Sequence, residues 1–409
     1  MVSAAVGHGM THGLELAFAA LLTYIGVTFG ADLAVLGTVA TIGTFTFGAT
    51  APPAGFLSDR YGPRAVIAGC MFAAAIFAFA VAASPSLPVL AVALALLGAA
   101  IGFYHPAGTA MVSTVTKRRG MAFAAHGIAG NVGVALAPVV SIGIAIAVDW
   151  RAAYVVLGAM ALATALLVWR IAPGPEAARE QRRMADAQTT AGGASQPRTA
   201  PPLTRSWLAP ALLLVYTVAI GMGFIYRGAL TFMATHIEAN LGFTLFGWST
   251  SALTGALTTI VLLFALLGQV VGGTLSDRMP VERAAVPITL GAFPLLALGG
   301  MTGGVVMLVA LAGFVVMNFA QQPIINGLIA DYAPQGARGK AYGISFFLTF
   351  GVGSIAGSIG GFVAQAFGTS GAFVMLAFVG VGIAVLALAI AIGAEKRRGE
   401  VTPVGVVAE

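Results

Sequence analysis

The sequence predicts an all-α integral membrane protein with twelve transmembrane helices in two pseudo-symmetric halves of six. Of its 409 residues, 59% are hydrophobic and only 8% are charged, against roughly 25% charged residues in a soluble domain. Twelve apolar runs approach the roughly 20 residues that a membrane-spanning helix needs. The hexapeptide Gly55–Arg60 (Gly-Phe-Leu-Ser-Asp-Arg) returns as Gly273–Arg278 (Gly-Thr-Leu-Ser-Asp-Arg), 218 positions later (273 minus 55). The repeat and the apolar runs therefore indicate a duplicated membrane protein.

Each apolar run is expected to be helical, because backbone polar groups cannot remain unpaired in hydrocarbon. In the first half the predicted spans are 8–30, 36–56, 65–83, 88–115, 122–147 and 153–171. In the second half they are 208–236, 246–275, 284–301, 304–330, 341–367 and 371–392. Pro106 answers to Pro323, and Gly133 to Gly353, at shifts of 217 and 220 (323 minus 106 and 353 minus 133). The duplication thus extends along most of each half.

These runs divide the chain into four parts. A first bundle, 1–171, is followed by the segment 172–206, which is rich in Pro, Gly, Ala, Gln, Thr and Arg and has no apolar periodicity. Such a composition predicts a disordered linker. A second bundle, 207–393, precedes a tail, 394–409.

The positions of the cations predict the orientation. Eighteen of the 20 Lys and Arg residues fall in the loops and tail on one side of the predicted bundle. Short cytoplasmic loops retain Lys and Arg, so this side, the linker and both termini are predicted to be cytoplasmic, with the protein in the inner (plasma) membrane. The pI of about 9.8 then reflects topology, and no nucleic-acid partner is expected.

The first copy of the repeated phrase continues as Gly55, Leu57, Asp59, Arg60, Gly62 and Arg64. This pattern resembles the signature loop between helices 2 and 3 of the major facilitator superfamily. The second copy keeps Gly273, Leu275, Asp277 and Arg278 but departs at Met279. The resemblance implies a secondary transporter whose halves rock about a site near the midplane. Both loops are expected to act as a conformational latch in which the glycines allow close packing and the aspartates bind helix amides or a facing Arg.

A narrower similarity is to the fosmidomycin-resistance-like, drug:proton antiporter group. It rests on His8–His12, Tyr104–Gly108 and Gly130–Gly133 with Pro138. The antiporter motif has a Gly-Pro pair where this chain has Gly133-Val134, which leaves the transport direction open. Gly127, Gly130 and Gly133 also form a smooth stripe that lets another helix approach.

Glu15 is the only acidic residue well inside an apolar run. An ionisable group there costs about 2.5 to 3.5 kcal/mol to insert and is a functional candidate by default. Desolvation disfavours the charged carboxylate, which suits a proton carrier; a structural carboxylate is the alternative. His12 and His105, which precedes Pro106, are expected to shape the proton path. His126 is expected at the surface or in packing, and His236 in water.

Arg227 is the only cation deep in an apolar run. Aligning the ends of spans 1 and 7 at a shift of 212 (227 minus 15) places it opposite Glu15. Its guanidinium suits a carboxylate or phosphonate substrate, although a permanent salt bridge between the halves is an equal alternative. Uncharged polar and aromatic side chains are expected to complete the substrate site: Tyr104, Tyr226, Asn131, Asn318, Gln321, Gln322 and Asn326.

A metal site is an alternative for the first span. His8, His12 and Glu15 follow i, i+4, i+7 spacing on one helix face, and imidazole with carboxylate suits zinc. Span 7 offers Ile220, Phe224 and Arg227 instead of a second ligand set. No metal or other cofactor is therefore assigned.

The sequence contains no phosphate-binding Gly-Lys-Ser/Thr loop and no catalytic Ser or Cys constellation, so an enzyme is not expected. The leading function is proton-coupled export of a small organic compound, with an anion favoured by Arg227. The alternatives are an organic-anion uptake symporter, a divalent-metal exporter and a transport-inactive receptor or assembly subunit. The expected partners are the lipid bilayer, a small-molecule substrate and protons, and a monomer suffices.

Overall fold

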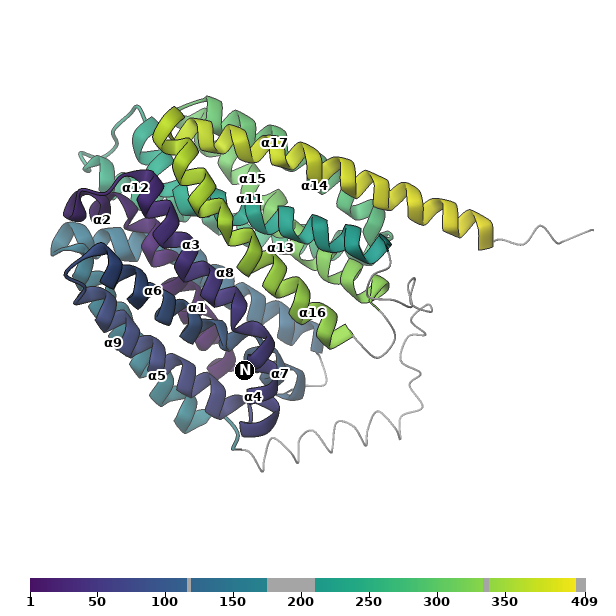
Figure 1. Cartoon of the computed structure of the whole chain (residues 1–409), viewed down its shortest axis with the longest axis horizontal. Helices are drawn as coiled ribbons and strands as arrows, with labels where there is room; N and C mark the ends of the chain where they lie inside the picture. The colour runs from purple at the N-terminus through teal and green to yellow at the C-terminus, as the bar shows by residue number, and fades with distance from the viewer. Residues whose placement is uncertain (116–118, 175–209, 334–337, 402–409) are drawn as a thin grey trace, which may run out of the picture.

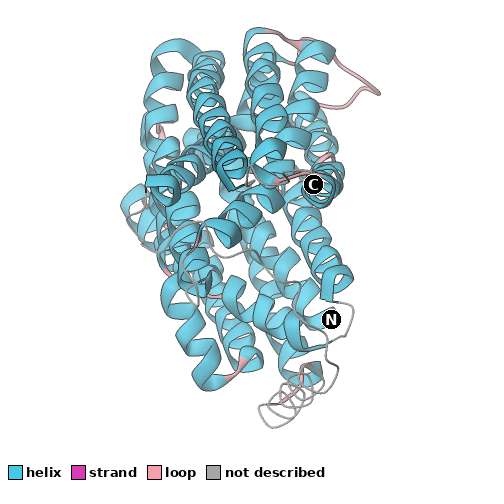
Figure 2. Cartoon of the chain, turned by 90° about the vertical axis from the view of Figure 1, so that its right-hand side faces the viewer, coloured by secondary structure: helices cyan, strands magenta, loops and turns pink. Residues whose placement is uncertain are grey.

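The computed structural model describes residues 1–115, 119–174, 210–333 and 338–401, and these residues form helices and short connections without a strand. Figure 1 shows the first half, purple to blue, beside the second half, teal to yellow. Figure 2 shows the helices running roughly along one direction. The all-α prediction is confirmed.

The first half contains six spans. They are α1 (Val2–Ala20) with α2 (Leu22–Phe29), α3 (Leu33–Ala49) with α4 (Ala51–Tyr61), α5 (Pro63–Ala82), α6 (Leu87–Gly102) with α7 (Tyr104–Val115), α8 (Arg119–Ala147) and α9 (Trp150–Ile171). The first two pairs are bent by 49° and 41°. The break before α7 precedes Pro106, whose missing amide and ring disfavour a regular helix over the preceding turn.

The second half repeats this plan. Its elements are α11 (Pro210–Asn240), α12 (Thr250–Leu263) with α13 (Ala265–Arg278), α14 (Val281–Met301), α15 (Gly304–Tyr332), α16 (Arg338–Phe346), the π-helical turn η1 (Phe347–Gly351), the 3₁₀ turn η2 (Val352–Ile355) and α17 (Ala356–Val401). Gly368, with φ of 71°, divides α17 into two helices. The φ value lies where glycine avoids the steric penalty of a side chain.

The number of spans agrees with the sequence. In the described part of the chain, nine helices are long and apolar enough to cross a membrane, and the two bent pairs raise this to eleven. The longest of the nine, Lys340–Arg397, contains the break at Gly368. Dividing it there gives the twelve spans that the sequence predicts.

Some boundaries differ from the prediction. The first helix begins at Val2 instead of residue 8, and the last continues to Val401, so the first part of the predicted tail is helical. Hydropathy marks the part of a helix that lies in hydrocarbon, whereas the helix itself continues wherever its backbone hydrogen bonds do. The predicted linker lies outside the described residues except for 172–174.

The two ends of the molecule differ. We call the end that carries Arg60, Arg64, Arg170 and Arg278 the basic end, and the end with the connections at 30–32, 83–86, 148–149, 241–249 and 302–303 the far end. The halves meet where α3 packs on α17 and where α8 packs on α12. A Cβ on Gly37 would lie 2.1 Å from the carbonyl oxygen of Gly357, so the first of these contacts brings two backbones together.

Hydrogen bonds between the halves close the far end. The Leu33 amide donates to Gln365 at 3.1 Å, and the Thr23 hydroxyl donates to Glu238 at 3.2 Å. Farther into the bundle, the Ser358 amide donates to the Thr41 hydroxyl at 2.8 Å, and the Val139 amide to the Thr259 hydroxyl at 3.2 Å. These four bonds join the two halves on the far side of the bundle.

Candidate functional site

A buried ion pair joins the two halves at the centre of the bundle. Glu15 on α1 contacts the guanidinium of Arg227 on α11, and their side chains are only 4% and 6% exposed. The contact that the pseudo-symmetry suggested is therefore formed. Because a buried charge without its partner is strongly destabilising, each side chain holds the other in place.

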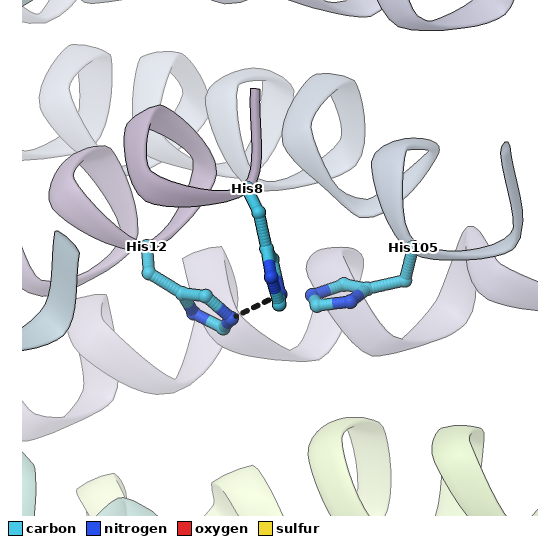
Figure 3. Close-up of side chains that lie close together, drawn as sticks. All are labelled: His8, His12 and His105. Atoms are coloured by element: carbon cyan, nitrogen blue, oxygen red, sulfur yellow. Dashed lines mark hydrogen bonds between the residues drawn. The ribbon is translucent and has the colours of Figure 1, made fainter. Parts of the chain in front are cut away.

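A chain of imidazoles continues from this pair toward the basic end. The second carboxylate oxygen of Glu15 contacts Nδ1 of His12. Nε2 of His12 lies 3.2 Å from Nε2 of His8, the dashed contact in Figure 3. Nδ1 of His8 donates to the carbonyl oxygen of His126 at 2.7 Å. These groups form one continuous polar path from the ion pair to α8.

Helix periodicity and glycine place this chain. His8, His12 and Glu15 lie on one face of α1, and α8 packs closely against that helix. A Cβ on Gly130 would lie 2.5 Å from the His8 ring, and one on Gly133 would lie 2.1 Å from the Gly9 carbonyl oxygen. Two of the three glycines in the predicted stripe therefore make room for α1, whereas a Cβ on Gly127 would meet no described atom within 4 Å.

His105 on α7 completes a cluster with His8 and His12. Its ring centroid lies 5.1 Å from that of each of the other two, and one nitrogen from each ring falls in a group spanning at most 4.8 Å. Figure 3 shows the three rings turned toward a common point. The structure thus adds His105 to His8 and His12, the two histidines that the sequence offered as metal ligands, while Glu15 contacts the other nitrogen of His12.

Aromatic rings surround Arg227, and of these only Tyr226 was predicted from the sequence as a site residue. The guanidinium carbon lies 5.2 Å from the ring centroid of Phe350, 5.3 Å from that of Phe47 and 5.4 Å from that of Tyr226. Such rings attract cations through their electron-rich faces. Phe350 lies in the π-helical turn, a feature that often marks functional positions. The cage depends on spans 2, 7 and 11 meeting, which no local pattern reveals.

The guanidinium also keeps unused donors. Nε and Nη2 of Arg227 are buried and have no hydrogen-bond partner among the described residues. A buried donor without an acceptor costs about 1 to 3 kcal/mol.

A small cavity lies next to the ion pair on its far-end side. Its volume is about 50 Å³ and its walls come mainly from α1, α3, α6 and α11. Glu15, Arg227, Thr44 and Thr231 supply its polar groups, and apolar side chains form the rest. This volume holds a few waters, so the conformer is nearly closed around the charges.

The other residues predicted for the substrate site differ in burial and in position. Tyr104 is completely buried and donates its hydroxyl to the Ala4 carbonyl, so it fastens α7 to α1. Tyr226 faces Arg227. Asn131, Asn318 and Gln321 are buried, and Nδ2 of Asn131 has no described hydrogen-bond partner. Gln322 and Asn326 are exposed in the basic half of α15, where Gln322 bonds to Gln269.

The predicted latch residues lie at the basic end. Asp59, Arg60, Asp277 and Arg278 are exposed. Arg64 donates to the Trp169 carbonyl and lies 4.6 Å over its ring, and Gly62 adopts a φ of 83° that favours glycine. A Cβ on Gly55 or Gly273 would meet no described atom within 4 Å, so the expectation of close packing fails for both. The neighbouring Gly272 is the tightly packed one, because its Cβ would lie 2.2 Å from the Ala320 carbonyl oxygen.

Two other histidines differ in environment. His126 is buried and stacks on His8 with centroids 4.1 Å apart, so it packs rather than facing the surface. His236 was expected in water but is 0% exposed. Its two ring nitrogens contact the Thr369 hydroxyl at 2.9 Å and the Gly299 carbonyl oxygen at 3.0 Å. Packing by spans 9 and 12 buries it, which the position near a helix end did not reveal.

Comparisons with known proteins agree with this architecture. The family model described as Major Facilitator Superfamily matches residues 4–358 and 246–406. No curated protein matches the sequence. Among solved structures, a bacterial homolog of the human lysosomal transporter Spinster, in an inward-facing and occupied conformation, has a TM-score of 0.72 at 14% identity, covering 96% of this chain and 94% of that one.

Two further structures show the same fold. A mutant peptide transporter POT in complex with alafosfalin has a TM-score of 0.74 at 14% identity, covering 97% of this chain and 94% of the other. The inward open xylose transporter XylE from E. coli has a TM-score of 0.69 at 16% identity, covering 94% of each chain.

Proposed function

The chain belongs to the major facilitator superfamily, and from that premise we propose that it moves a small organic anion together with a proton by alternating access. The observation that carries the proposal is the Glu15–Arg227 pair with its two unused guanidinium donors. Residues 1–171 and 207–393 act as the two rocking bodies, and the pair lies between them.

The coupling of anion transport to proton transport follows from the charges of Glu15 and Arg227. Both Glu15 oxygens are engaged, by Arg227 and His12, whereas Nε and Nη2 of Arg227 have no described partner. A carboxylate or phosphonate that binds Arg227 competes with Glu15 for the same cation. Protonation of Glu15 removes that competition, because a neutral carboxyl group no longer attracts the guanidinium. Anion and proton are therefore bound together, which is symport.

Glu15 is the proton carrier, and His12 contacts its carboxylate on the side toward the basic end. His12 contacts Glu15 with one nitrogen and His8 with the other. The rings of Phe47 and Phe350 lie beside the guanidinium of Arg227. Hydrogen bonds join the halves on the far side, and we assign the loading or release of substrate to the basic, cytoplasmic end.

Export in exchange for protons is the second candidate. It is favoured by the similarity of His8–His12, Tyr104–Gly108 and Gly130–Gly133 to the fosmidomycin-resistance-like group. A cationic compound would use the Glu15 carboxylate and displace its proton, so proton and substrate would move in opposite directions. Substrate charge and the direction of proton flow thus separate the two candidates.

The test uses proteoliposomes loaded with a pH-sensitive dye and challenged with carboxylates, phosphonates and cationic drugs. Symport predicts that an external anion acidifies the lumen, and that Glu15→Gln and Arg227→Gln each abolish this signal. Glu238→Gln is the matched control. Glu238 lies in span 7, as Arg227 does, and accepts hydrogen bonds, but it is at the far end. Alkalinisation with outward proton flow driven by external cationic drugs would instead support exchange, and anion-driven flux that survives Glu15→Gln would refute the assigned proton carrier.

A further inference from the structure

The histidine cluster has an unusual arrangement of hydrogen-bond donors. Nδ1 of His8 faces a carbonyl oxygen, which only accepts, so this nitrogen carries the hydrogen. A neutral imidazole has one N–H, so its Nε2 then carries a lone pair. Nδ1 of His12 faces the Glu15 carboxylate that is paired with Arg227, and the same reasoning places a lone pair on its Nε2.

Two lone pairs therefore face one another across the 3.2 Å between the Nε2 atoms of His8 and His12. Either a proton shared by the two nitrogens or a metal ion beside the rings satisfies both lone pairs. A third nitrogen is close by, because Nε2 of His105 is buried and has no described hydrogen-bond partner. The three rings converge in Figure 3, with one nitrogen from each inside a 4.8 Å group.

We propose that His8, His12 and His105 bind one divalent first-row transition ion of the zinc type. Zinc–nitrogen bonds of about 2.0 to 2.1 Å in tetrahedral geometry place ligand nitrogens about 3.4 Å apart, close to the His8–His12 distance of 3.2 Å. Three imidazole nitrogens suit zinc, copper, nickel or cobalt, whereas calcium and magnesium require oxygen ligands. The nitrogens of the group lie within 4.8 Å of one another, and a movement of His105 toward the other two rings completes the tripod.

The surroundings support this assignment. Metal-binding histidines commonly donate their other N–H to a carbonyl or carboxylate, which fixes the ring and leaves the second nitrogen for the ion. His8 has the carbonyl oxygen of His126 in that position, and His12 has Glu15. The ion and the ion pair are thereby connected through one ring, so the metal orients the carboxylate that faces Arg227.

The placement of the ligands makes the ion resident rather than transported. All three come from α1 and α7 in the first half, so a rocking motion of one half against the other leaves the tripod intact. A transported ion would need ligands that change as access alternates. The inference goes beyond the proposed anion transport and does not depend on it.

The experiment measures zinc bound to the purified full chain in detergent, after removal of any histidine tag and of metal by chelation. Isothermal titration and elemental analysis are expected to show one zinc per chain, and His105→Phe to weaken binding at least tenfold. Phenylalanine keeps the ring that packs on Phe47 and Phe346 and removes only the nitrogens. His236→Phe is the control, because His236 lies away from the cluster and is also buried.

A second variant distinguishes loss of a metal ligand from misfolding of the protein. His105→Cys restores a zinc ligand and is expected to recover most of the affinity that His105→Phe loses. Cobalt added to the wild-type protein is expected to give the visible absorption of a low-symmetry nitrogen site. Absence of zinc at micromolar concentrations, or equal loss in His105→Phe and His236→Phe, would overturn the inference. Neither result involves transport, so proton-coupled flux can fail while zinc still binds, and the reverse.

Discussion

At the scale of single residues, Glu15 and Arg227 form a buried ion pair between the two halves. Glu15 and Arg227 are each costly to bury alone, and each is nearly covered by protein. Their pairing offsets part of that cost and makes both side chains sensitive to whatever binds the other. His12 extends this sensitivity to the histidine cluster, since it contacts Glu15 and His8 with its two nitrogens.

The ion pair predicts a non-additive stability effect. Arg227→Ala leaves Glu15 charged and buried, and breaking a buried pair in this way costs about 3 to 5 kcal/mol. We expect a large fall in the midpoint of thermal unfolding in detergent. Glu15→Gln combined with Arg227→Ala is expected to recover much of that loss, because no unpaired charge remains.

The control for this measurement is Arg278→Ala, which removes an exposed arginine and is expected to change stability little. If the double variant were no more stable than Arg227→Ala alone, the destabilisation would come from lost packing against the aromatic rings and not from the orphaned carboxylate.

The aromatic cage gives a second prediction at this scale. Phe350→Leu keeps an apolar side chain but removes one ring from Arg227, a contribution of about 0.5 to 2 kcal/mol for a cation near an aromatic face. We expect weaker substrate binding with proton coupling retained, measured as a raised half-saturating concentration in the flux assay. Phe56→Leu, on an exposed ring remote from the cage, serves as its control, and equal effects in both would argue against the cage.

At the scale of elements, close helix contacts place the site. The α1–α8 contact depends on Gly133 beside the Gly9 backbone and on Gly130 beneath the His8 ring. Small residues let backbones approach in a membrane, where association relies on packing rather than on the hydrophobic effect. The α3–α17 contact uses Gly37 against Gly357 in the same way, and it brings the π-helical turn of span 11 toward Phe47.

This packing predicts opposite outcomes for two glycines one helix turn apart on α8. Gly130→Ala would place its Cβ 2.5 Å from the His8 ring, and such overpacking typically costs about 1 to 3 kcal/mol. Gly127→Ala meets no described atom within 4 Å, and alanine favours a helix by about 1 kcal/mol over glycine. Thermal unfolding of both variants is the measurement, with a lower midpoint expected for Gly130→Ala only.

The same pair reports on the histidine cluster. Gly130→Ala is expected to reduce zinc affinity, because displacement of the His8 ring separates it from His12, whereas Gly127→Ala retains the wild-type affinity. Unchanged zinc affinity in a folded Gly130→Ala variant would show that the His8 position is not set by α8.

At the scale of the whole molecule, the contacts that join the two halves include those of α3 with α17 and of α8 with α12, and the central ion pair. Thr41 on α3 lies in the first of these contacts, with its hydroxyl 3.0 Å from that of Ser358. Alternating access requires these contacts to separate when the basic end closes. Preventing that separation is expected to stop transport.

A cross-link tests this requirement. In a Cys70→Ala background, Thr41→Cys with Ser358→Cys is expected to form a disulfide on mild oxidation and to lose flux, which a reductant restores. Thr46→Cys with Ala95→Cys is the control, because Thr46 bonds to the Ala95 carbonyl within the first half. Full transport with the Thr41–Ser358 link in place would contradict rocking of the halves.

The sequence alone anticipated the architecture because its signals are local. Hydropathy marks each span, and the repeated Gly-x-Leu-Ser-Asp-Arg phrase marks the duplication. Glu15 and Arg227 stood out because a charge in an apolar run is costly wherever the helix packs. The ends of the helices do not follow from hydropathy alone, since α17 continues past the apolar residues to Val401.

What only the tertiary structure decided is which distant side chains meet. His105 and His126 join His8 because α7 and α8 pack on α1, and Phe47 and Phe350 enclose Arg227 because spans 2 and 11 cross beside span 7. The same packing buried His236 and left Gly55 and Gly273 free of the close contacts expected for them. The sequence by itself determined which groups the membrane makes costly; contacts between helices far apart in the chain determined their partners, because those depend on the assembled bundle and on no local pattern.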